Sequence, residues 1–135
     1  MRAIPLHIWP ILGAAIAKIV LGALWYSPAL FIGPWQRMSG ITAAQMQERM
    51  GRALVVDIVG SFLMAFVLAH VIGWAEATTV LQGLTVGFFL WLGFVVVVTI
   101  HTVTYERKPF ALFVLHNGYH LISLVVMSAI LAVWR

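Results

Sequence analysis

Four apolar stretches, each about twenty residues long, fill almost the whole of this 135-residue chain. Each is long enough to cross a hydrocarbon core of about 30 Å as a helix that rises about 1.5 Å per residue. Apolar and polar residues do not alternate within them, which argues against a transmembrane β-barrel. The sequence predicts an all-α integral membrane protein, a compact bundle of four transmembrane helices over about 4–26, 53–74, 80–102 and 110–134.

Composition supports a single membrane domain over residues 1–135. Hydrophobic residues make up 63% of the chain and charged residues only 9%, and a soluble domain of this size cannot bury that much apolar surface. The chain has no cysteine, which excludes disulfides and thiolate metal ligands. The formal charge is +4, but the basic residues are scattered around the spans, so we expect no nucleic-acid partner. Because the first span contains Lys18 and ends in bulky Trp25, we expect a mature helix and not a cleaved signal peptide.

The basic residues also predict how the chain is oriented. The loops after the first and third spans carry most of them: Arg37, Arg49, Arg52, Arg107 and Lys108. The opposite side has Arg2 and Arg135. The positive-inside rule then places both termini outside the cytoplasm.

The first loop is the largest segment between spans. Pro34, Ser39 and Gly40 predict an irregular stretch. Thr42 to Gln45 then has the form of a capping box, which predicts a short interfacial helix over about 42–50. Residues 64–69 resemble 127–132, so a parallel 2+2 duplication of two hairpins is a further hypothesis.

Several blocks of the sequence resemble one family. They include residues 22–28 (Gly-Ala-Leu-Trp-Tyr-Ser-Pro), 64–70 and 118–121 (Gly-Tyr-His-Leu). The chain is similar over nearly its whole length to the bacterial membrane-protein family called domain of unknown function 1761. The resemblance implies a small four-helix protein of the bacterial cytoplasmic membrane and supplies no reaction. The pair His116-Asn117 departs from the pattern, so a metal role for His116 would be special to this chain.

Ionisable residues within the spans are the first candidates for a site, because they are costly in a bilayer. Lys18 lies near the middle of the first span and Asp57 about one turn inside the second. We expect an ion pair between them. It could serve as structural glue or as a proton or substrate site. Alternatively, Lys18 extends alone to the interface and Asp57 caps its helix.

Three histidines are expected in the same layer as this pair. His101, His116 and His120 fall in the inner halves of the third and fourth spans. His116 and His120 are four residues apart and share a helix face. Interhelical hydrogen bonding, a proton or substrate role, and ligation of a metal, haem or chlorophyll-type pigment are all open to them. Ligation is the weakest of these, and no cofactor is predicted.

Small residues predict where helices approach closely. Gly83 and Gly87 form a Gly-x-x-x-Gly face on the third span, and Gly13 and Ala17 form a similar face on the first. Such faces serve intramolecular packing or a homodimer.

No arrangement of nucleophile and base, phosphate loop or paired acid–base carboxylates can be assembled, so an enzyme is not expected. Two classes of function remain. The chain is either an accessory or structural subunit that packs with itself or a larger membrane complex, or a minimal carrier or channel. In the second class Lys18, Asp57 and the inner histidines would bind a solute or relay protons.

Overall fold

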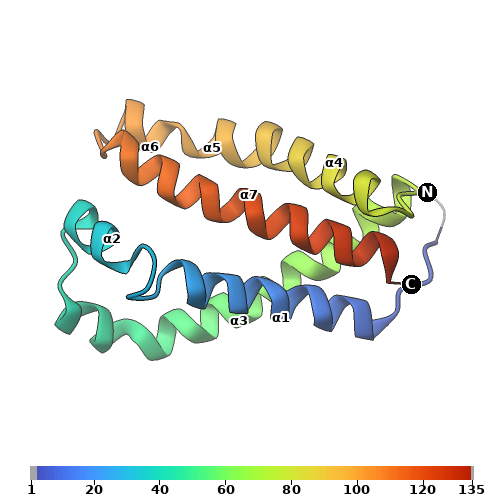
Figure 1. Cartoon of the computed structure of the whole chain (residues 1–135), viewed down its shortest axis with the longest axis horizontal. Helices are drawn as coiled ribbons and strands as arrows, with labels where there is room; N and C mark the ends of the chain where they lie inside the picture. The colour runs from blue at the N-terminus through green and yellow to red at the C-terminus, as the bar shows by residue number, and fades with distance from the viewer. Residues whose placement is uncertain (1–2, 135) are drawn as a thin grey trace.

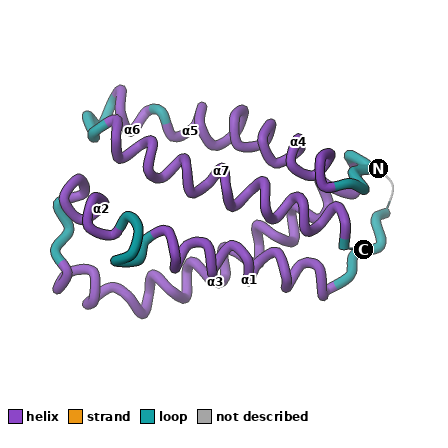
Figure 2. Tube along the Cα trace, viewed as in Figure 1, coloured by secondary structure: helices purple, strands orange, loops and turns teal. Residues whose placement is uncertain are grey.

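The computed structural model describes residues 3–134, and helices account for most of them (Figures 1 and 2). Within that range, four helical segments are long and apolar enough to cross a membrane. This agrees with the predicted fold class. The elements are α1 (Ile8–Trp25), α2 (Ile32–Ser39), α3 (Ala43–Trp74), α4 (Val80–Leu90), the π-helix η1 (Trp91–Val96), α5 (Val97–Thr99), α6 (His101–Thr104) and α7 (Phe110–Val133).

The long helices form two hairpins. α3 packs on α1, and α7 packs on the segment from α4 to α6, as Figure 1 shows. α7 also contacts α1 and α3, so it joins the hairpins. The first and last described residues lie at one end of the bundle, here called the terminal end. α2 and the 105–109 loop lie at the other end, here called the loop end. The proposed 2+2 duplication stays a prediction.

The first loop is more helical than the sequence predicts. The capping box is present, because the Thr42 hydroxyl accepts from the Gln45 amide at 3.2 Å and the Gln45 side chain accepts from the Thr42 amide at 3.1 Å. The helix that it opens is continuous with the second span and does not end near residue 50. Residues 32–39, expected to be irregular, form α2, since Pro34 falls in its first turn where a missing amide costs nothing. Gly40 ends α2 with φ of 72°.

The hydrophobic core lies in the terminal half of the bundle. Its buried members are small or aliphatic: Ile11, Ala14, Ala15, Ala65, Leu68, Ile72, Ala77, Leu124, Met127, Leu131 and Ala132. Gly83 and Gly87 bring α4 against the backbone of α7, since a Cβ at these positions would lie 2.6 and 2.8 Å from the carbonyl oxygens of Ser128 and Leu124. The Gly-x-x-x-Gly face is therefore used within the chain.

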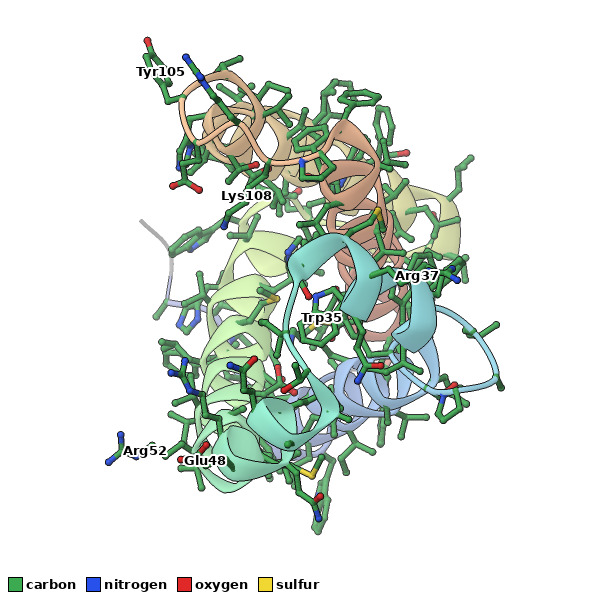
Figure 3. The ribbon with its side chains drawn as sticks, turned by 90° about the vertical axis from the view of Figure 1, so that its left-hand side faces the viewer. Trp35, Arg37, Glu48, Arg52, Tyr105 and Lys108 are labelled. Atoms are coloured by element: carbon green, nitrogen blue, oxygen red, sulfur yellow. The ribbon has the colours of Figure 1, made fainter. Side chains whose placement is uncertain are left out.

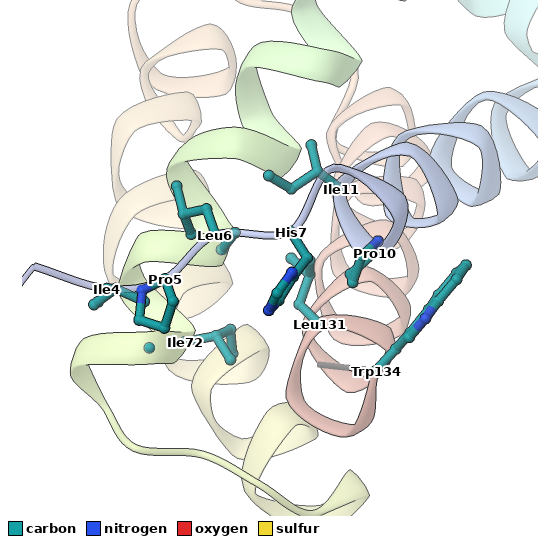
Figure 4. Close-up of a pocket in the computed structure, with 11 residues that line it drawn as sticks. Ile4, Pro5, Leu6, His7, Pro10, Ile11, Ile72, Leu131 and Trp134 are labelled. Carbon is teal, nitrogen blue, oxygen red and sulfur yellow. The ribbon is translucent and has the colours of Figure 1, made fainter.

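The first residues of the described chain close the terminal end. Ile4 packs on Gly73, where an added Cβ would lie 2.6 Å from the Ile4 side chain. His7 and Trp134 line a cavity of about 110 Å³ beside them (Figure 4). Gly13 lies against the Trp134 ring, since a Cβ added at Gly13 would be 2.4 Å from that ring. Ala17, the other small residue of this face, is half-buried further along α1.

Arg2 and Arg135, which enter the charge count for orientation, lie outside the described residues. The placement of the termini outside the cytoplasm thus stays a prediction. The arrangement does put the 75–79 connection at the same end as the termini, and the loops rich in basic residues at the other.

Candidate functional site

Lys18 and Asp57 form the expected ion pair between α1 and α3. The Lys18 ammonium lies 3.1 Å from Asp57 Oδ1 and 3.0 Å from the hydroxyl of Ser61. The Ser61 hydroxyl in turn donates to the carbonyl of Asp57 at 2.6 Å. The two charges are unequally buried, because the Lys18 side chain is 8% exposed and that of Asp57 is 46% exposed. The Lys18 ammonium therefore depends on Asp57 and Ser61 for its hydrogen bonds, whereas part of the Asp57 carboxylate is exposed at the surface of the protein.

The two residues also start at different depths along the bundle. Lys18 lies about 15 Å along α1 from Ile8, and Asp57 lies about 26 Å along α3 from Trp74, at about 1.5 Å per residue. Lys18 thus starts near mid-membrane and extends toward the loop end, where Asp57 is close to the boundary of the hydrocarbon core.

Tyr119 on α7 holds the lysine from the other side. Its ring centre is 5.6 Å from the Lys18 ammonium, within range for a cation–π contact. Its hydroxyl donates to the Lys18 carbonyl at 3.2 Å. Gly22 makes room for it, since a Cβ there would lie 2.8 Å from the phenol oxygen. The ion pair therefore ties together α1, α3 and α7.

A second polar cluster lies nearer the loop end. The hydroxyl of Tyr26 is 2.6 Å from Nδ1 of His116. We assign the phenol as the donor, because Tyr is a stronger acid than a neutral imidazole; the ring hydrogen of His116 is then on Nε2. No partner for that Nε2 hydrogen is present among residues 3–134. His116 thus has one fixed nitrogen and one free donor.

His116 and His120 line one cavity of about 260 Å³ between α7 and the segment α5–α6. Its other lining residues are Thr99, Thr102, Lys108, Leu112, Phe113 and Asn117. Figure 3 looks onto this end: Tyr105 points out of the bundle, and Lys108 lies nearer its middle, below the 105–109 loop. The lining is polar at the histidine and lysine positions and apolar at Leu112 and Phe113. No carboxylate lines it.

Asn117 and Trp91 fix the wall of this cavity, and the sequence did not reveal them as a pair. The indole N–H of Trp91 donates to the Asn117 carbonyl at 2.8 Å. The Asn117 amide donates to Thr99 Oγ1 at 3.1 Å and to the Phe113 carbonyl at 3.0 Å. Trp91 begins the π-helix η1, whose extra residue per turn changes which side chains face α7. The one feature of the sequence that pointed to this hydrogen-bonded pair was an asparagine, Asn117, within an apolar span.

His101 does not join the other two histidines. Its Nδ1 contacts the Val98 carbonyl, and its Nε2 lies 4.0 Å from Glu106. The side chain is half exposed and does not line the cavity. Nor do Lys18 and Asp57 line it, so the predicted inner layer consists of two clusters. They meet at Tyr119, whose ring centre lies 5.6 Å from the Lys18 ammonium and 5.5 Å from the Tyr26 ring centre. No group of three or more His, Asp or Glu side chains that could hold a metal was found among residues 3–134.

The comparison with protein families agrees with the resemblance described above. The model of the family described as "protein of unknown function (DUF1761)" matches residues 9–132. The chain belongs to this family. The DUF1761 match spans the four long helices and includes every residue of the two polar clusters. No curated protein and no solved structure matches the chain significantly.

Proposed function

We propose that this DUF1761 protein is a non-enzymatic subunit that assembles in the membrane, with a second copy of itself or within a larger complex. A solute site would require Lys18 to face a hydrated cavity. Instead its side chain is 8% exposed and held by Asp57 and Ser61. An ion pair whose ammonium is buried between helices fixes how those helices pack and suits a structural role.

The observation that carries the proposal is an apolar groove on the outside of the bundle. It has a volume of about 390 Å³ and lies between α3 and the α4–α7 hairpin. Its lining is apolar: Gly60, Leu63, Met64, Val67, Leu68, Val71, Leu90 and Leu124. A Cβ at Gly60 would meet nothing within 4 Å. Small residues let another helix approach closely, and close packing is what drives helix association in lipid.

The loop half of α3 adds to this argument. Every residue from Gln47 to Gly60 is exposed, although the helix continues across the membrane boundary. Lipid chains can cover valine and leucine, but they solvate the half-exposed Asp57 carboxylate poorly wherever water from the headgroup region does not reach it. A neighbouring helix that offers a polar group there would cover it at lower cost.

A photo-crosslinking residue at Leu63, in the groove, tests the proposal in intact membranes. The matched control places the same residue at Leu92, an exposed leucine at similar depth on η1 that does not line the groove. We expect a protein adduct of one defined mass from position 63, either twice 15.0 kDa or a fixed larger value. Lipid adducts alone at both positions would overturn the proposal.

A minimal carrier or channel is the second candidate, favoured by the cavity at the loop end. It would use His116 and His120, since Lys18 and Asp57 lie outside that cavity. Its test is flux of solutes or protons into vesicles that contain the purified protein. A flux abolished by His120→Phe, with normal assembly, would replace the subunit proposal with this one.

A further inference from the structure

We propose that the cavity between α7 and α5–α6 binds the phosphate group of an anionic phospholipid. The site, here called the headgroup cavity, consists of Thr99, Thr102, Lys108, Leu112, Phe113, His116, Asn117 and His120. The inference is independent of the assembly proposal, because the headgroup cavity and the groove share no residue.

The free hydrogen-bonding groups of the cavity indicate an anion. Tyr26 occupies Nδ1 of His116 and leaves the Nε2 hydrogen free. Neither nitrogen of His120 has a hydrogen-bond partner among residues 3–134. Lys108 adds a full positive charge at the rim. Together these groups offer donors and no carboxylate, which suits phosphate oxygens.

The other polar groups are already used within the protein. The Asn117 amide donates both hydrogens to Thr99 and Phe113, and the Thr102 hydroxyl donates to the Thr99 carbonyl at 2.9 Å. They hold the wall in place. Glu106 does not line the cavity, but its half-exposed carboxylate pairs with Lys108 at 3.3 Å. The lysine therefore has a weak competitor that a phosphate can displace or share.

The depth and shape of the cavity point to a lipid as the source of the phosphate. Lys108 lies two residues before Phe110, the first residue of α7, at the level of the headgroups, and His116 lies about 9 Å along the helix from Phe110. Leu112 and Phe113 lie along α7 between Lys108 and His116 and give the same cavity an apolar wall, which can contact the carbon atoms next to the phosphate of a lipid. A volume of about 260 Å³ accommodates a phosphate with part of a glycerol. Basic pockets between transmembrane helices commonly hold anionic headgroups.

The test measures lipid retention by native mass spectrometry of the full chain from nanodiscs with equal phosphatidylcholine and phosphatidylglycerol. We expect phosphatidylglycerol to be retained in preference to phosphatidylcholine. Lys108→Gln and His120→Phe should each lower that retention about fivefold, the effect of losing about 1 kcal/mol. Glu106→Gln should raise it by removing the competitor. The side chains of Lys108 and Glu106 are exposed, so Lys108→Gln and Glu106→Gln should keep the fold.

Arg37→Gln is the matched control. It removes one positive charge at the same end, on the opposite side of the view in Figure 3, and Arg37 does not line the cavity. Its retention should stay within about twofold of the parent chain. An equal loss for Lys108→Gln and Arg37→Gln, or no preference between the lipids, would overturn the site. Inorganic phosphate in large excess should leave the lipid bound; if it displaces the lipid and stays on the protein, the source is a soluble phosphate and the lipid assignment is wrong.

Discussion

The two ends of this bundle are built differently. At the terminal end, four helices pack through alanines, glycines and aliphatic side chains, and residues 4–7 and Trp134 close the bundle. At the loop end the helices separate, polar side chains line a cavity, and half of α3 has no buried face. The terminal end is complete within one chain. The loop end has a polar cavity that can bind a lipid headgroup and an exposed half of α3 that can pack on a second protein. This contrast between the two ends underlies both the assembly proposal and the headgroup proposal.

The largest expected effect comes from breaking the terminal end. The double variant Gly83→Leu and Gly87→Leu would place side chains against the backbone of Ser128 and Leu124, which cannot rotate away. We expect a loss of more than about 3 kcal/mol, enough to abolish the folded bundle. Unfolding by SDS titration in mixed micelles measures it.

Gly93→Leu serves as the control for this pair, since a Cβ there meets nothing within 4 Å. It should change the free energy of unfolding by less than about 1 kcal/mol. Equal effects from Gly93→Leu and from the double variant would show that α4 and α7 are not held together by these glycines.

The ion pair should respond unequally to removal of its two charges. Asp57→Asn leaves a buried ammonium with only Ser61 and Tyr119 as neighbours, and we expect a cost of about 3 kcal/mol. Lys18→Met should cost less, about 1 kcal/mol, because Asp57 is half exposed and sits near the membrane boundary. The double variant Lys18→Met and Asp57→Leu should recover most of the loss.

The same SDS titration measures all three variants and gives the coupling between the two residues. A double variant that is as unstable as the sum of the single ones would mean that the pair does not interact in the membrane. Equal costs for the two single variants would contradict the unequal burial.

The smallest effect is expected from the indole hydrogen bonds to α7. Trp91→Phe removes the bond to the Asn117 carbonyl at 2.8 Å, and Trp25→Phe removes a bond to the Leu115 carbonyl at 3.2 Å. Each should cost about 1 kcal/mol, with the larger loss at Trp91 because its ring also packs on the core. A larger loss at Trp25 would mean that the loop end carries more stability than its open packing suggests.

The sequence was sufficient to predict the four long apolar helices and the Lys18–Asp57 ion pair. Long apolar spans determine the fold class, and the inner-half positions of Lys18 and Asp57 led to their pairing. It could not predict the headgroup cavity. That cavity depends on the π-helix at Trp91–Val96 and on the Tyr26–His116 bond, which joins residues ninety positions apart. Nor could the sequence show that His101, expected in the same layer as His116 and His120, contacts Val98 and Glu106 and does not line that cavity.

The central claim is that the chain is completed by another protein in the membrane. The most direct test is a native mass spectrum of the protein extracted gently from its own membrane. We expect a defined assembly heavier than the 15.0 kDa chain, either multiples of that mass or a complex with a companion. A spectrum that holds only the single 15.0 kDa chain, with or without lipid, under conditions that preserve known membrane complexes, would contradict it.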